Sequence, residues 1–222
     1  MKTALITGTS HGLGEDIALT LLQNGWRVIG LSRSVNENLS KLDNFSQIIL
    51  DISDKQKVIA SLKNLNEIDC VINNAAIFKL ASFDETSFDE IESLINTNVL
   101  GSMYVTKASL HSLKLNGKII FINSVAGLNE FEGQSIYCAS KHALTAFSSI
   151  LSKELKDKKI KTVSIHPGGI NTPLWKETSY PVGDVEKALS VKDISSLILF
   201  ILNSPEYIEY KTVTMFPEVE SH

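Results

Sequence analysis

The chain has 222 residues, and its 43% hydrophobic and 21% charged content is ordinary for a soluble globular domain. A formal net charge of -4 gives no reason to expect nucleic acid or a membrane as the main partner, and the sequence shows no secretory signal or membrane span. Two cysteines, Cys70 and Cys138, are typical of reduced thiols in a cytoplasmic protein, and a single domain over residues 1–222 is expected.

The chain begins with a predicted buried strand and a helix joined by glycines. The strand covers residues 3–7 and is stopped by Gly8, and the helix that follows closes at Asn24-Gly25. Between them lies the turn Gly8-Thr9-Ser10-His11-Gly12-Leu13-Gly14. Glycines here let the backbone approach a pyrophosphate, whose charge the helix N-terminus favours. Alone they often form only a tight turn, but directly after the first strand they indicate a dinucleotide site.

The end of the second predicted strand, residues 27–31, indicates which dinucleotide is bound. An NAD site usually has an acidic residue there for the ribose 2′-hydroxyl, but this chain has Ser32 followed by Arg33. A serine removes the repulsion of a 2′-phosphate, an arginine can pair with it, and His11 could add positive charge. If Arg33 is only a surface residue and His11 only a loop residue, this argument fails. We expect NADP(H) to be preferred over NAD(H).

Two further predicted strands end in polar residues. Asp51 and Ile52 follow the third strand, residues 47–50, where Asp51 either accepts from an adenine amino group or caps the helix that begins near Asp54. The fourth strand, residues 70–72, runs into Asn73-Asn74-Ala75-Ala76. This tetrapeptide either knits strand ends together beside a cofactor cleft or forms only a turn.

A long buried helix is predicted over residues 87–113, with Asn98 in its interior. Asn98 is a poor helix former, so it is either a satisfied core amide or a residue that holds water near an active site. The fifth strand, residues 118–123, ends at Ser124, whose hydroxyl could polarise a carbonyl oxygen.

Tyr137 and Lys141 lie one turn apart on the next predicted helix. An ammonium beside a phenol favours the phenolate, so we expect Lys141 to lower the pKa of Tyr137 towards neutrality. The phenol could then transfer a proton at physiological pH. Such a pair alone often lies on a solvated helix face.

The sixth strand, residues 161–166, leads into Pro167-Gly168-Gly169-Ile170-Asn171-Thr172-Pro173, where backbone groups and the Thr172 hydroxyl could meet a cofactor amide. Strands and helices alternate throughout, which predicts an α/β fold of the Rossmann-like, doubly wound type, with about seven parallel strands. The candidate residues follow successive strands, so they are expected to share one cleft.

Together these motifs make residues 3–203 resemble the short-chain dehydrogenase/reductase family. The glycines match its TGxxxGxG turn, and Asn73-Asn74-Ala75-Ala76 resembles its NNAG with Ala76 in place of glycine. Its four catalytic positions and its PG motif are matched by Asn98, Ser124, Tyr137, Lys141 and Pro167-Gly168.

The resemblance implies roles for these residues. Tyr137 would exchange the proton, Lys141 would lower its pKa and bind the nicotinamide ribose, and Ser124 would orient the substrate oxygen. Asn98 would help to hold a water in a proton relay linked to Lys141. The predicted cofactor contacts are Gly8, Ser10, His11, Gly12, Leu13, Gly14, Ser32, Arg33, Asp51, Ile52, Asn74, Ala75, Tyr137, Lys141, Pro167, Gly168, Ile170 and Thr172. No metal site is predicted.

Two regions depart from the family pattern. The substrate-covering segment, near residues 173–192, is short; Leu174, Trp175, Tyr180 and Val182 are either pocket walls or packing residues, with Phe78 and Phe131 opposite. The C-terminus lacks the family's glycine-rich ending, which often contributes to tetramer contacts. The expected partner is a second copy of the chain, in a homodimer through helices 87–113 and 137–156 or in a homotetramer.

The sequence therefore favours an NADPH-dependent carbonyl reductase, run in reverse as an alcohol dehydrogenase. A regulatory NADP-binding protein with a weak active site is the alternative, although it has no need of all four catalytic residues. A methyltransferase built on a similar sheet is a third possibility, but that function would not explain why Tyr137 and Lys141 are present.

Overall fold

The computed structural model describes residues 1–172 and 187–218. Within these residues, seven parallel strands form one sheet in the order β3-β2-β1-β4-β5-β6-β7, which confirms the predicted doubly wound fold. The strands are β1 (Thr3–Thr7), β2 (Arg27–Ser32), β3 (Phe45–Ile49), β4 (Ile68–Asn73), β5 (Leu113–Ile122), β6 (Lys161–Pro167) and β7 (Thr212–Met215). The strand order reverses between β1 and β4, and ligands of such sheets bind beyond the strand ends at this point.

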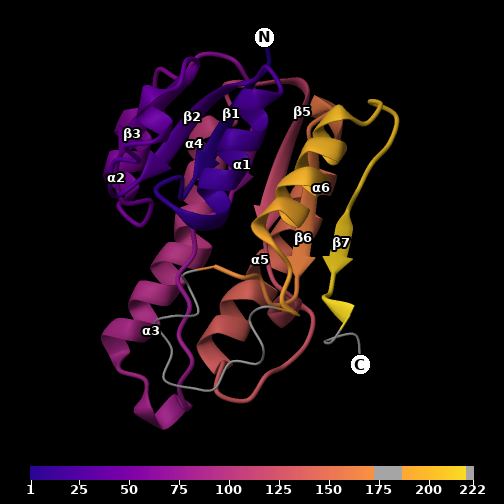
Figure 1. The fold of residues 1–222 in the computed structure, drawn as a ribbon. Coiled ribbons are helices and arrows are strands. Elements are labelled where there is room, and N and C mark those ends of the chain that lie inside the picture. The colour runs from indigo at the N-terminus through magenta and orange to yellow at the C-terminus, as the bar shows by residue number, and fades with distance from the viewer. Residues whose placement is uncertain (173–186, 219–222) are drawn as a thin grey trace.

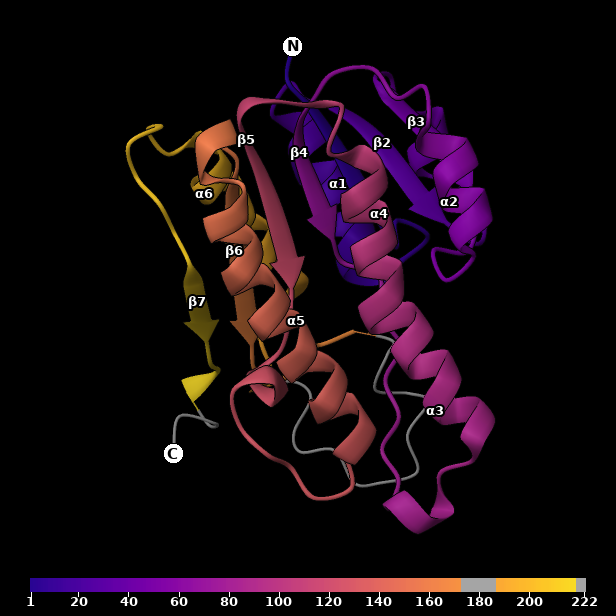
Figure 2. The same ribbon diagram turned by 180° about the vertical axis from the view of Figure 1, so that it is seen from behind.

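Helices cover both faces of the sheet. They are α1 (Gly12–Gln23), α2 (Lys55–Leu62), α3 (Phe88–Ile95), α4 (Ser102–Ser109), α5 (Ser135–Glu154) and α6 (Val191–Asn203). Figure 1 shows α1 and α6 on one face, and Figure 2 shows α2, α4 and α5 on the other. None of the helices in the described ranges is both long enough and apolar enough to cross a membrane.

Alternating residues of the apolar strands build two separate cores. Ile6 of β1 belongs to the core beneath α1 and α6, and its neighbour Leu5 belongs to the core beneath α4 and α5. Both side chains are fully buried. Because successive strand residues point to opposite faces, a strand covered on both faces reads as a continuous apolar run. This is why β1 was predictable from the sequence alone.

The predicted helix 87–113 is wrong at its C-terminal end. The segment consists of α3, a π-helical turn η3 (Asn96–Gly101) and α4, and it stops at Ser109. Residues 113–122 belong instead to β5, which is longer than the predicted strand. Leu113 pairs with Ile68, the register then shifts, and Asn116 has a φ of 64°. The turn-forming pair Asn116-Gly117 interrupts the apolar pattern, so the sequence places the start of this strand too late.

Helix capping tests one of the two roles considered for Asp51. The side chain of Asp54, not that of Asp51, accepts a hydrogen bond from Lys57 N and caps α2. Asp51 Oδ1 instead accepts from the backbone and hydroxyl of Ser53. The capping role is therefore wrong for Asp51.

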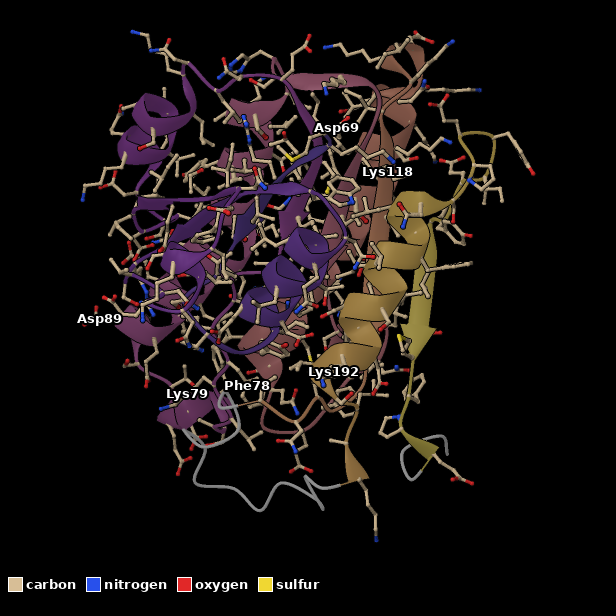
Figure 3. All side chains as sticks on the ribbon, turned by 45° about the horizontal axis from the view of Figure 1, so that its top comes forward. Asp69, Phe78, Lys79, Asp89, Lys118 and Lys192 are labelled. Carbon is tan, nitrogen blue, oxygen red and sulfur yellow. The ribbon has the colours of Figure 1, made fainter. Side chains whose placement is uncertain are left out.

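A third apolar cluster lies beyond the carboxyl ends of the strands, where α3 and the start of α5 extend past the sheet (Figures 1 and 2). It contains Leu94, Tyr137 and Cys138, with Phe78 packed against it. Figure 3 shows Phe78 at this end of the molecule, whereas Asp69 and Lys118 lie at the opposite end. The candidate residues are thus gathered at one end of the fold.

Candidate active site

The carboxyl ends of the strands surround a cleft of about 270 Å³. It runs from the glycine turn after β1 to the first turns of α5. Of the residues predicted from the sequence, it is lined by Gly8, Ser10, His11, Gly12, Leu13, Gly14, Ser32, Arg33, Asp51, Ile52, Asn74, Ala75, Phe78, Tyr137, Lys141, Ile170 and Thr172. The shared cleft expected from the motif order is therefore present.

The glycine turn brings backbone, without side chains, to the cleft wall. A Cβ atom on Gly14 would lie 2.0 Å from the carbonyl oxygen of Gly8, so no side chain fits there. Gly12 and Gly14 lie in the first turn of α1, whose N-terminus favours an anion. These residues fit the pyrophosphate of a dinucleotide.

Asn74 and Ala75 join the ends of β4 and β1, so of the two alternatives, a link between strand ends or only a turn, the first is correct. The backbone N–H groups of Asn74 and Ala75 each donate to Thr7 Oγ1 at 2.9 Å. Asn74 Nδ2 donates to Thr7 O, also at 2.9 Å. The strand ends beside the glycine turn are thereby held together.

Arg33 and Ser32 lie where the 2′ position of an adenosine ribose was predicted. Ser32 is buried and Arg33 is exposed, and both line the cleft. The Ser32 hydroxyl donates to Ser34 O at 2.9 Å and accepts from Gln47 Nε2. Gln47 lies on β3 and is not among the site residues predicted from the sequence. The apolar pattern of a strand does not indicate which groups a glutamine side chain contacts.

Tyr137 and Lys141 share one face of α5, as their spacing predicts. The rings of Tyr137 and Phe78 meet edge to face, with centroids 4.8 Å apart. Lys141 Nζ lies over the Tyr137 ring, 5.5 Å from its centroid, and donates to Ile122 O at 3.1 Å. Both side chains are buried, so the solvated-face alternative is wrong for this pair.

The predicted direction of the Tyr137 pKa shift is wrong. Burial raises the pKa of Tyr137 to about 12, and a hydrogen bond with the Ser124 side chain opposes this only in part. Burial also lowers the pKa of Lys141 to about 8. Desolvation of the buried phenol is the largest cause of this shift, and it outweighs the attraction that the Lys141 ammonium has for a phenolate.

Ser124 follows β5 directly but lies outside the cleft lining. Its Oγ accepts a hydrogen bond from Ala126 N at 3.1 Å and N-caps the turn η4 (Val125–Gly127). Its carbonyl oxygen lies 2.9 Å from His166 Nδ1. A carbonyl only accepts, so the imidazole carries its proton on Nδ1. Burial lowers the pKa of His166, which the sequence indicated only as the end of a strand.

Asn98 is the satisfied core amide of the two alternatives. It lies in the π-helical turn η3, its Oδ1 accepts from Ile77 N at 2.8 Å, and its Nδ2 donates to Ile77 O at 2.9 Å and Ser140 Oγ at 3.2 Å. The side chain thus ties the loop after β4 to α5, one residue before Lys141.

Besides Ser124 and Asn98, three further predicted residues do not line the cleft, and Trp175 is not described. Pro167 ends β6 and Gly168 N donates to Met215 O, so the structure uses these two to join β6 and β7. Phe131 lies between η4 and α5 with 41% of its surface exposed and does not line this cleft, so its role as a substrate-pocket wall stays a prediction. Trp175, with Leu174, Tyr180 and Val182, lies outside the described residues.

Comparisons with known proteins cover nearly the whole chain. The family model described as short chain dehydrogenase matches residues 2–182. An uncharacterized oxidoreductase of Staphylococcus saprophyticus is 30% identical over 97% of this chain and 97% of its own length. Serine dehydrogenase from Escherichia coli has a crystal structure with a TM-score of 0.85 at 27% identity, covering 99% of this chain and 100% of that chain. The closed form of serine dehydrogenase complexed with NADP+ gives 0.90 at 28% identity, covering 99% and 96%.

Proposed function

Because the chain belongs to the short-chain dehydrogenase family, whose members are NAD(P)-dependent oxidoreductases, we propose that it reduces a small carbonyl substrate with NADPH and runs in reverse as an alcohol dehydrogenase. The observation that carries this proposal is the placement of Tyr137. Its buried phenol and Lys141 line the same cleft as the glycine turn. A proton donor and a dinucleotide cradle thus share one cleft.

Tyr137 is the proton donor in the reduction. With a pKa raised to about 12, the phenol keeps its proton throughout the neutral range and is ready to give it to a carbonyl oxygen. The bound nicotinamide supplies the hydride for this chemistry. In the reverse direction the phenol must first lose its proton to solvent, and the resulting phenolate then takes a proton from the hydroxyl group of the substrate.

Lys141 and Ser124 support the proton transfer at Tyr137. A phenolate forms as the proton leaves, and the Lys141 ammonium 5.5 Å from the ring centre lowers its free energy. The Ser124 side chain hydrogen-bonds with Tyr137, and it orients the substrate oxygen beside the phenol. Asn98 is a positioning residue that holds Ser140, and through it the first turns of α5, against the loop after β4.

Arg33 supplies the positive charge for the 2′-phosphate of NADPH, and the His11 ring can add a hydrogen bond. Both line the cleft, and Ser32 in place of an acidic residue leaves no carboxylate to repel that phosphate. The relative described as serine dehydrogenase complexed with NADP+ supports this preference. NADH, which lacks the phosphate, gains nothing from Arg33.

The proposal also includes a homodimer through α3, α4 and α5, or a homotetramer. Ile150 of α5 is 50% exposed and Phe88 of α3 is 89% exposed, so apolar surface remains uncovered in one copy. Light scattering on purified protein is expected to give the mass of a dimer or tetramer. A monomer at micromolar concentration would refute this part alone.

A carbonyl panel tests the activity. Purified protein is mixed with NADPH and a set of aliphatic and aromatic aldehydes and ketones, and consumption is followed by nicotinamide absorbance. The reverse assay uses NADP+ with simple alcohols and L-serine, which the relative's name suggests as a first hydroxyl substrate. Turnover with at least one substrate, lost in Tyr137→Phe, is the expected result.

Two outcomes would contradict the proposal. Unchanged turnover in Tyr137→Phe would show that another group transfers the proton. Tight NADPH binding without turnover on any substrate would favour a regulatory nucleotide-binding protein.

A further inference from the structure

The side-chain amide of Gln47 contacts three points of the segment that carries Arg33. Gln47 lies on β3, the edge strand beside β2 (Figure 1). Its Nε2 donates to Ser32 Oγ and, at 3.0 Å, to Ser34 O. Its Oε1 accepts from Asn36 N at 3.1 Å. One amide therefore holds both ends of the segment 32–36.

These contacts determine what Ser32 can do. The Ser32 hydroxyl has a single proton, and it donates that proton to Ser34 O at 2.9 Å. Because Gln47 supplies the hydrogen bond that the hydroxyl accepts, the proton stays directed at Ser34. The Ser32 proton is thus already engaged in this structure, and we infer that the binding of a 2′-phosphate depends mainly on Arg33 and on how its backbone is held.

Asn36 connects the same segment to the glycine turn. Its side chain is buried, and its Nδ2 donates to Thr9 O at 3.1 Å and to Ser10 O at 3.0 Å. Its Oδ1 accepts from Asn38 N and Leu39 N. The segment is fixed at one end to the pyrophosphate side of the cleft by Asn36, and along its length to β3 by Gln47.

We propose that Gln47 is a positioning residue that determines the preference for NADPH over NADH. It holds residues 32–36 so that the Arg33 guanidinium meets the 2′-phosphate without first having to order its backbone. The two cofactors differ only at that phosphate, so Gln47 contributes to the binding of one and not of the other. This inference rests on the proposed NADPH preference.

Cofactor binding tests the inference without a substrate. Dissociation constants for NADPH and NADH are measured by nicotinamide fluorescence on wild type and on Gln47→Met, which keeps the length of the side chain but removes its donors and acceptor. We expect NADPH affinity to fall about tenfold, the loss of one or two hydrogen bonds, and NADH affinity to stay within about twofold. Adenosine 2′,5′-bisphosphate, which carries the 2′-phosphate without nicotinamide, is expected to weaken as NADPH does.

Three further variants separate this role from general damage to the fold. Ser46→Ala changes an exposed neighbour on β3 and is expected to leave both affinities unchanged. Asn36→Ala also loosens the glycine turn, so it is expected to weaken NADPH and NADH alike. Gln47→Glu places a carboxylate against segment 32–36 and is expected to weaken NADPH binding more than Gln47→Met does. If Gln47→Met does not fold, Gln47→Glu can take its place in the test.

The results distinguish failure of this inference from failure of the proposed function. A wild-type protein without a preference for NADPH would overturn both. If wild type prefers NADPH and Arg33→Ala abolishes the preference, but Gln47→Met and Gln47→Glu keep it, the role of Gln47 alone is refuted. Equal losses for NADPH and NADH in Gln47→Met would refute it as well.

Discussion

The ammonium of Lys141 lies 5.5 Å from the centre of the Tyr137 ring and donates a hydrogen bond to the carbonyl oxygen of Ile122. The lysine is thereby anchored to the end of β5, at a fixed place relative to the phenol. Its charge stabilises Tyr137 little while the phenol is protonated. The stabilisation grows when the proton leaves, which is what a catalytic charge requires.

Removing the charge of Lys141 should therefore slow the reaction more than it weakens substrate binding. We expect Lys141→Met to lower kcat for carbonyl reduction about 100-fold or more, the usual cost of a lost charge-stabilising donor. KM for the carbonyl should change by less than about threefold. Steady-state kinetics at saturating NADPH measure both, and a loss confined to KM would show that Lys141 only binds substrate.

The pH dependence of the reduction should follow the ionisation of the Lys141 side chain. Tyr137, with its pKa raised to about 12, remains protonated throughout the neutral range, so it imposes no change there. Lys141, with its pKa lowered to about 8, loses its charge as the pH rises through that value. We expect kcat/KM for reduction to be flat below pH 8 and to fall above it.

Lys141→Arg provides the control, because a guanidinium stays protonated at these pH values. Whatever its absolute rate, its profile should lack the fall above pH 8. A fall that persists in Lys141→Arg would assign it to another group.

The sequence predicted the features that depend on local pattern. The strand β1 and the glycine turn follow from an apolar run that ends at Gly8, and the facing of Tyr137 and Lys141 follows from helix periodicity. The pKa of Tyr137 could not be predicted, because desolvation depends on the packing of Phe78 and other distant residues around the phenol.

Gln47 and His166 were missed for a related reason. Gln47 contacts Asn36, 11 residues away, and His166 contacts Ser124, 42 residues away. Both contacts form only when neighbouring strands align in the sheet. Both residues lie within strands, where the pattern of apolar residues predicts which side chains are buried but not which hydrogen bonds they make. The predicted β5 is too short because Asn116, with a φ of 64°, and Gly117 interrupt the apolar pattern.

Burial of His166 should make the fold less stable in acid. Its folded-state pKa lies below the ordinary value of 6.5, so the unfolded chain binds more protons as the pH falls through 6.5 and downward. Stability is therefore complete above that pH and is lost below it. We expect the urea midpoint to fall between pH 7 and pH 5 more steeply in wild type than in His166→Leu. His111→Gln, at an exposed histidine, should keep the wild-type slope, and equal slopes in wild type and His166→Leu would contradict the prediction.

The contact of Gly14 with Gly8 should make the glycine turn intolerant of one methyl group. In Gly14→Ala the new Cβ would lie 2.0 Å from Gly8 O, a backbone atom, so the turn itself must shift. We expect a loss of about 1–3 kcal/mol in the free energy of unfolding and at least about tenfold weaker binding of NADPH and NADH alike. Urea denaturation and fluorescence titration measure the two effects.

Gly25→Ala is the matched control for this prediction. Gly25 has a φ of 76° but no atom within 4 Å of the added Cβ, so alanine there is strained without touching the cleft. It should cost about 1 kcal/mol of stability and leave both cofactor affinities unchanged. If Gly14→Ala weakens the cofactors no more than Gly25→Ala does, the turn around Gly14 does not hold the dinucleotide. If instead it weakens NADPH but spares NADH, the turn would be acting on the 2′-phosphate and not on the pyrophosphate that the two cofactors share.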